Sequence, residues 1–170
     1  MTKVFWLFGR SGAGKTTLGR RLHQSLLDRK IPVFYLDGDE LRHGLCSDLT
    51  FTPSARLENH RRIAEVARLA ADQHLNVIVT TMAPQHSQRD IAAQVLGERL
   101  VWIYVHAPLE VCIRRDPKGL TDARRPGSWT DCWIIRLTCP VRGSGNILLT
   151  LSPRMWTAPP NQFWSWRGAI

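Results

Sequence analysis

The segment that most constrains this chain is "GRSGAGKT" (Gly9 to Thr16), which lies between a short apolar run and a helical pattern. Val4–Phe8 is unbroken and apolar, as expected of a strand buried on both faces. From Lys15 to about Arg29, leucines recur at helical spacing. The pattern G-x-x-x-x-G-K-[ST] in this context predicts a loop whose backbone N–H groups surround phosphate oxygens. The alternative is a glycine turn that merely caps a helix.

Beyond this loop, short apolar runs alternate with helical patterns. We expect strands at Val33–Leu36 (buried), Leu75–Thr80 and Leu100–Val105, and helices at about Ser54–Gln73, Ser87–Leu96 and Pro108–Arg114. Ser54 is the expected N-cap of the longest helix. This alternation predicts an α/β, P-loop NTPase-like (Rossmann-like) three-layer domain with a mainly parallel sheet of four to five strands. Because ligands bind at the carboxyl ends of such strands, the segments after Phe8, Leu36 and Thr80 should share one rim.

Composition limits the classes of partner. The chain of 170 residues is 44% hydrophobic and 22% charged, as in an ordinary globular domain. Its net charge of +9 fits a site for polyanionic nucleotides, and since no nucleic-acid-binding motif accompanies it we expect no nucleic-acid partner. The first apolar run is too short for a signal sequence or a membrane span, so we expect a cytoplasmic protein without membrane contact. The cysteines lack metal-ligand spacing and should be reduced.

The motif assigns roles to residues of the glycine-rich loop. Lys15 would reach the β- and γ-phosphates of a nucleoside triphosphate, and the Thr16 hydroxyl would hold Mg²⁺. The predicted ATP-binding residues are Gly9, Arg10, Ser11, Gly12, Ala13, Gly14, Lys15, Thr16 and Thr17.

The second predicted strand ends in Asp37-Gly38-Asp39. At the same rim, a carboxylate can hold metal-bound water or take a proton from an incoming hydroxyl. A solvated turn is the alternative. Since the sequence contains no N-K-x-D motif, a small-molecule kinase is favoured over a GTPase switch.

From Gly9 to Leu120 the sequence resembles the adenylylsulfate (APS) kinase family. The matching stretches are "GRSGAGKTTL", "LDGDELRHGL", "DLTF", "RLENHRRIAEVARLAAD", "TTMAP", "RD" at Arg89-Asp90, and "PLEVCIRRDPKGL". The resemblance implies phosphorylation of the 3′-hydroxyl of APS by ATP, which gives PAPS and ADP in sulfate assimilation. ATP and Mg²⁺ would be the cofactors and APS the small-molecule substrate. A homodimer is also considered.

The resemblance implies a catalytic set of Lys15, Asp39 and Asp37. Asp39 would orient or deprotonate the 3′-hydroxyl, and Asp37 would join Thr16 in the Mg²⁺ and water network. Which aspartate is the base stays open.

The resemblance also implies an acceptor site. Arg42, Arg56 and Asn59 would bind the sulfate–phosphate end and the ribose of APS, because the planar arginine fork suits that anion. Phe51 would stack on adenine. Lys118 would be the first residue of a lid that covers the reacting phosphates and excludes water. The full predicted substrate set is Asp39, Arg42, Phe51, Arg56, Asn59, Met82, Ala83, Lys118, Gly119 and Leu120. Without the resemblance, Phe51 reads as a core residue and Arg61-Arg62 as a solvated helix face.

Two positions depart from the family pattern. Where the family usually has I-S-P, this chain has Met82-Ala83-Pro84, so Ala83 cannot be phosphorylated and transfer would be direct. His86 stands where the family usually has an arginine. These departures keep an alternative open, a related P-loop kinase that acts on another nucleotide or small-molecule hydroxyl.

After Leu120 the resemblance stops and the composition changes. Five of the seven tryptophans follow residue 128. We predict a P-loop kinase core over residues 1–120 and an atypical tail over residues 121–170 that is not an independent domain. A frameshift near Thr121 explains the tail, because Thr121 to Pro140 read one base out of frame allows "RRAAAGELDGLLDYPFDVP", with the D-x-P-[FY]-[ED]-x-P pattern that the family has after its lid.

The alternative for the tail is a genuine, divergent extension. In either case the chain would lack the family's lid and terminal helix, so an inactive nucleotide-binding remnant is a further alternative to an active kinase.

Overall fold

The computed structural model describes residues 1–115, 136–137 and 147–148. Its centre is a four-stranded sheet in the order β2-β3-β1-β4, in which every neighbouring pair is parallel. The strands are β1 (Val4–Phe8), β2 (Val33–Asp37), β3 (Asn76–Thr81) and β4 (Leu100–Tyr104). The predicted α/β class is confirmed. A separate antiparallel pair joins β5 (Arg136–Leu137) and β6 (Ile147–Leu148).

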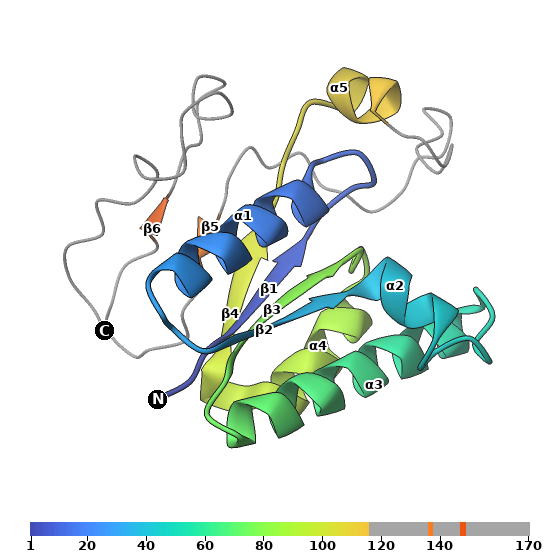
Figure 1. Cartoon of the computed structure of the whole chain (residues 1–170). Helices are drawn as coiled ribbons and strands as arrows, with labels where there is room; N and C mark the ends of the chain where they lie inside the picture. The colour runs from blue at the N-terminus through green and yellow to red at the C-terminus, as the bar shows by residue number, and fades with distance from the viewer. Residues whose placement is uncertain (116–135, 138–146, 149–170) are drawn as a thin grey trace.

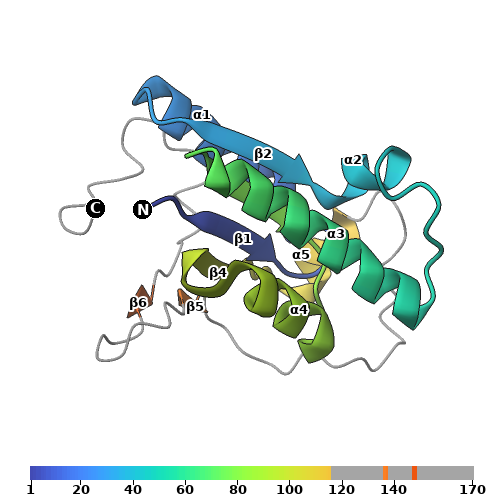
Figure 2. The ribbon, with the colours of Figure 1, turned by 90° about the horizontal axis from the view of Figure 1, so that it is seen from below.

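Helices cover both faces of the sheet, which gives three layers (Figure 1). Helix α1 (Lys15–Asp28) lies on one face, and α3 (Pro53–Asp72) and α4 (His86–Leu96) lie side by side on the other (Figure 2). The shorter elements are α2 (Gly38–His43), η1 (Gly97–Arg99) and α5 (Leu109–Arg114). Within the described ranges, no helix is both long enough and apolar enough to cross a membrane.

Strand β1 is the centre of the hydrophobic core, because its side chains alternate between the two faces. Trp6 packs among residues of α3 and α4, including Ile63 and Ala92, and is fully buried. Leu7, also fully buried, packs on the α1 side with Leu18. Burial of one such side chain contributes about 1.5–3 kcal/mol. The buried strand therefore gives the loop that follows it a rigid base.

Two details of the sequence prediction are wrong. Strand β2 is not buried on both faces, because it lies at the edge of the sheet and Phe34 is 41% exposed. The N-cap of α3 is Thr52 rather than Ser54, and Thr52 Oγ1 accepts a hydrogen bond of 3.3 Å from the Ala55 N–H. Pro53 explains the shift, because its fixed φ suits the first helical position.

The carboxyl ends of β1, β2 and β3 form the expected rim. The register places Phe8 opposite Thr81 and Asp37 opposite Thr80. The short helix α2, which the sequence did not predict, begins directly after Asp37, whose side chain caps it. The segments after Phe8, Asp37 and Thr81 therefore lie side by side at one edge of the sheet.

Candidate active site

The glycine-rich loop between β1 and α1 is held by backbone of the β4–α5 connection and of α5. A Cβ atom on Gly9 would lie 2.2 Å from the Val105 carbonyl oxygen. One on Gly12, whose φ is +72°, would lie 2.4 Å from the Cys112 carbonyl oxygen. Only glycine fits at such distances from backbone that cannot rotate away. The loop shape that the motif predicts is therefore fixed by packing.

Lys15 begins α1 and turns back over the loop. Its Nζ donates a hydrogen bond of 2.7 Å to the Arg10 carbonyl oxygen, and the Ala13 N–H also donates to that oxygen at 3.3 Å. Ala13 is buried, whereas Thr17 is exposed. The amino group thus lies beside the amides at the helix N-terminus, where positive potential suits a phosphate group.

Asp37 is the buried aspartate of the pair, with 6% exposure, and it accepts four hydrogen bonds. The donors are Thr16 Oγ1 at 3.1 Å, Thr80 Oγ1 at 3.0 Å, Tyr35 OH at 3.3 Å and the Asp39 N–H at 2.9 Å. Burial, with the Asp37 charge adding to it, raises the pKa of Tyr35, so the phenol stays neutral. Asp37 therefore joins β2, β3 and the glycine-rich loop.

Thr16 and Asp37 suit a magnesium ion chemically. A hydroxyl oxygen and a carboxylate oxygen lie 3.1 Å apart at the end of the glycine-rich loop. Oxygen atoms of this kind are the ligands that Mg²⁺ takes, usually one or two from protein with the rest from water and phosphate.

Asp39 differs from Asp37 in its surroundings. It is exposed in the first turn of α2, and its backbone N–H donates a hydrogen bond to the Asp37 carboxylate. The two aspartates therefore differ in burial, since Asp37 lies beneath the rim and Asp39 at its surface.

Three residues of the predicted acceptor site lie together. The Cζ atoms of Arg42 and Arg56 lie 4.5 Å and 5.7 Å from the centre of the Phe51 ring. Phe51 is 68% exposed, so its alternative interpretation as a core residue is wrong. Each arginine also donates to the loop before α3: Arg56 Nε to the Phe51 carbonyl oxygen at 2.9 Å and Arg42 Nη1 to that of Thr50 at 3.1 Å. An exposed ring flanked by two guanidinium groups suits an aromatic anion.

Asn59 and the segment after β3 complete this side of the rim. Asn59 is 5% exposed, and its buried Oδ1 has no hydrogen-bond partner among the described residues. The ring of His60 joins the two segments, with Nδ1 2.8 Å from the Arg56 carbonyl oxygen and Nε2 3.1 Å from that of Met82. Burial lowers the pKa of His60. Ala83 is fully buried.

Sequence reasoning missed several residues that shape this site. Arg89 Nη1 donates to the Pro84 carbonyl oxygen at 3.0 Å, and burial lowers its pKa. Tyr35 and Thr80 bond to Asp37. The available signal was a polar residue within each apolar strand. The predicted residues Lys118, Gly119 and Leu120 lie outside the described residues, as does the predicted tail apart from β5 and β6.

Comparison with known proteins shows the family to which the chain belongs. The family model described as adenylylsulphate kinase matches residues 1–132. The adenylyl-sulfate kinase of Paraburkholderia xenovorans is 47% identical over 124 residues, which cover 73% of this chain and 69% of that protein. That of Klebsiella pneumoniae is 44% identical over 125 residues, which cover 73% of this chain. The chain spans 62% of the length of the Klebsiella protein.

A solved structure gives the same result. The chain is similar to the APS kinase of Mycobacterium tuberculosis, whose structure was solved in complex with AMPPNP and APS. The two are 39% identical, with a TM-score of 0.67, and the match covers 70% of each chain. Since the family model matches well over half of the sequence, this chain belongs to the adenylylsulphate kinase family.

Proposed function

We propose that this chain transfers the γ-phosphate of ATP to the 3′-hydroxyl of adenylylsulfate. One observation carries the proposal: the buried Asp37 network joins the glycine-rich loop to the turn that bears Asp39. The cluster of Arg42, Phe51 and Arg56 lies at the far end of α2, the helix that begins at this turn. A donor site and an acceptor site are thus connected through one short element.

The donor side would bind ATP through the loop amides and Lys15. On binding, Lys15 would exchange its bond with the Arg10 carbonyl oxygen for phosphate oxygens. Thr16 and Asp37 would hold Mg²⁺, which when bound neutralises charge on the phosphates. Such transfer needs positioning and electrostatic stabilisation more than covalent chemistry from the protein.

The acceptor side would bind adenylylsulfate in an orientation set by its two ends. Phe51 would stack on the adenine, and Arg42 and Arg56 would bind the sulfate–phosphate anion. The unpartnered Oδ1 of Asn59 would accept a hydrogen bond from a ribose hydroxyl. Asp39 would then take the proton of the 3′-hydroxyl as the hydroxyl attacks the γ-phosphate. With Ala83 in the M-A-P segment, transfer would be direct.

The test is ADP release in the presence and absence of adenylylsulfate. We expect ATP turnover that depends on adenylylsulfate. Asp39→Asn should abolish turnover with ATP affinity kept, and Lys15→Ala should abolish it through weaker ATP binding with the fold intact by circular dichroism. Undiminished turnover in Lys15→Ala would contradict the role of the glycine-rich loop, and turnover without adenylylsulfate would contradict the acceptor.

We also propose the division into a kinase core (residues 1–120) and an atypical tail (residues 121–170) that arises from a frameshift near Thr121. The extent of the matches supports this division, because the family model ends at residue 132 and the matches to the relatives cover 73% of the chain. Sequencing the gene around codon 121 and assaying the frame-restored chain beside the present one would test it. Higher turnover in the restored chain is expected, and equal turnover with coding support for the present frame would contradict it.

The assembly and the compartment are proposals too. A similar structure, 33% identical with a TM-score of 0.53, is described as a hexameric APS kinase from Thiobacillus denitrificans. It supports self-association of this chain, for which we propose a homodimer in the cytoplasm. Light scattering at several concentrations would measure the mass, and a monomer throughout would contradict the dimer.

A further inference from the structure

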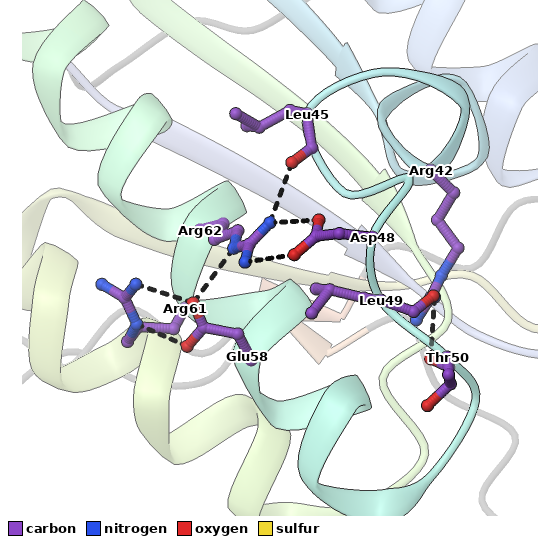
Figure 3. Close-up of polar contacts among 8 residues, drawn as sticks. All are labelled: Arg42, Leu45, Asp48, Leu49, Thr50, Glu58, Arg61 and Arg62. Atoms are coloured by element: carbon purple, nitrogen blue, oxygen red, sulfur yellow. Dashed lines mark hydrogen bonds and ion pairs between the residues drawn. The ribbon is translucent and has the colours of Figure 1, made fainter.

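The acceptor loop, defined as residues 44–52 between α2 and α3, is bound to α3 by a charged cluster (Figure 3). Arg62 is at its centre. Its Nη1 and Nη2 donate to the two carboxylate oxygens of Asp48 at 2.6 Å and 2.8 Å, and Nη1 also donates to the Leu45 carbonyl oxygen at 3.0 Å. Its Nε donates to Glu58 Oε1 at 3.0 Å. Arg62 therefore contacts the loop at two points and its own helix at a third.

Glu58 is held in turn by Arg61, whose Nε and Nη2 donate to its two oxygens at 2.7 Å and 2.8 Å. The two arginines lower the pKa of Glu58 to about 2, and Arg62 lowers the pKa of Asp48. Four alternating charges thus form a network with bidentate geometry, which is stronger than an isolated surface ion pair. The interpretation of Arg61-Arg62 as a merely solvated helix face misses these contacts.

Apolar packing gives the acceptor loop little support. Cys46 is its one buried residue, whereas Leu45 is 49% exposed and Phe51 is 68% exposed. A loop of this length with a single small buried side chain loses its shape readily unless polar contacts hold it. The polar contacts of Arg62 hold Leu45 and Asp48, in the first half of the loop.

The second half of the loop is held by the arginines of the proposed acceptor site. Arg42 Nη1 donates to the carbonyl oxygens of Leu49 and Thr50 at 3.3 Å and 3.1 Å, and Arg56 Nε donates to that of Phe51. Figure 3 shows Arg62 reaching the loop through Leu45 and Asp48, and Arg42 reaching it through Leu49 and Thr50. Arg62 contacts no residue of the predicted substrate set in these bonds, so its effect on the acceptor would pass through the loop.

We propose that Arg62, with Asp48 as its partner, is a positioning residue for the acceptor. It fixes the acceptor loop so that Phe51 is already in place between Arg42 and Arg56 when the substrate arrives. This inference rests on the proposed function for the identity of the acceptor. It adds that substrate affinity depends on an ion-pair network outside the predicted substrate set.

The first experiment needs no ligand. Hydrogen–deuterium exchange of residues 44–52 should accelerate about five- to tenfold in Arg62→Met, the equivalent of a lost exposed ion-pair network. The matched control is Arg68→Met, because Arg68 lies on the same helix and pairs in the same way with Glu65 at 3.0 Å and Asp72 at 2.9 Å. Unchanged exchange in Arg62→Met, or equal acceleration in both variants, would overturn the proposal.

The second experiment measures affinity by calorimetry. In Arg62→Met the Kd for adenylylsulfate should rise about five- to tenfold while that for ATP stays constant, and Arg68→Met should change neither. Arg62→Lys should not restore affinity, because an ammonium group cannot bridge Asp48, Glu58 and Leu45 together. A looser loop with unchanged affinity would overturn the positioning role.

Two further variants keep the outcomes distinct. Asp48→Asn should reproduce the effects of Arg62→Met, and the double variant should add little to either one. Additive effects would contradict a direct partnership, and Asp48→Asn decides the question if Arg62→Met folds poorly. If the unmodified chain binds ATP but no adenylylsulfate, the proposed acceptor fails, whereas the exchange experiment still shows whether Arg62 holds the loop.

Discussion

The glycine-rich loop (residues 9–16) and the acceptor loop (residues 44–52) serve the same rim of the sheet but are held there by different forces. The first is pressed against backbone of the β4–α5 connection and of α5, and it follows a strand whose central residues are buried. The second is largely exposed and is held by arginines that donate to its carbonyl and carboxylate oxygens. Close packing tolerates almost no change of volume, whereas charged contacts can be weakened by degrees. A substitution in the glycine-rich loop should therefore cause a large loss of ATP binding. A substitution among the charged contacts of the acceptor loop should weaken substrate binding only by degrees.

The largest expected effect is on the packed loop. Gly12→Ala introduces a Cβ 2.4 Å from the Cys112 carbonyl oxygen at a φ of +72°. Strain of about 3 kcal/mol or more would weaken ATP binding by roughly 100-fold. The control is Gly97→Ala, with a φ of +54° but open space around the added Cβ, which should lower Tm and leave calorimetric ATP affinity unchanged. Intact affinity in Gly12→Ala would remove the contrast between the loops.

A smaller effect is expected where the two sides meet. Asp37→Asn turns an amide group toward donors that now bond to a carboxylate, at a cost of about 1–3 kcal/mol. Denaturant unfolding should show this loss, and Mg²⁺ should no longer tighten ATP binding. Asp90→Asn, at an exposed position on α4, should change neither quantity. If Mg²⁺ tightened ATP binding in Asp37→Asn as it does in the unmodified chain, Asp37 would not belong to the magnesium site.

On the acceptor side, Phe51→Ala should act on one ligand alone. The ring is 68% exposed, so its removal should hardly change stability. Loss of stacking on a base is worth about 1–3 kcal/mol, so the Kd for adenylylsulfate should rise roughly tenfold while that for ATP stays constant. Phe34→Ala removes an exposed ring on β2 and should alter neither Kd. An equal loss of affinity for adenylylsulfate and for ATP in Phe51→Ala would mean that the two loops are not independent.

The smallest expected effect is that of low pH on the acceptor loop. Arg61 and Arg62 lower the pKa of Glu58 from 4.5 to about 2 on folding. A carboxyl group with a lowered pKa stabilises the folded state above its unfolded pKa, and this stabilisation is lost as pH falls through the folded pKa. Between about pH 4.5 and 2, the protection of residues 44–52 against exchange, corrected for the intrinsic pH dependence of amide exchange, should therefore fall a few-fold more than that of residues 9–16. Glu58→Gln should reduce the difference, with the rest due to Asp48, whose pKa Arg62 also lowers, and simultaneous loosening of both loops would contradict it.

The sequence predicted the donor side better than the acceptor side, because the donor side depends on local spacing. Gly9 to Thr16 carries its geometry within eight residues between a strand and a helix. By contrast, Arg62 and Glu58 stand four positions apart on one helix, yet Asp48 lies fourteen positions before Arg62 and joins them only after the chain turns. The edge position of β2 was missed for the same reason, because strand order does not show in the hydropathy of a single strand.

Two errors of the sequence prediction concerned local secondary structure. Thr52 and Ser54 are both good caps, and Pro53 between them decides which one begins α3. Helix α2 has only six residues, too few for a periodic pattern to appear, so the sequence predicted no helix after the second strand.

The contact between Gly12 and the Cys112 carbonyl oxygen has a mechanical consequence. The clearance there is smaller than one methyl group, so the glycine-rich loop cannot advance toward α5, nor α5 toward the loop. A movement of either one toward the other must therefore displace both. A push of α5 toward the loop would therefore displace the backbone that bears the phosphate-binding amides, without any side chain carrying the force.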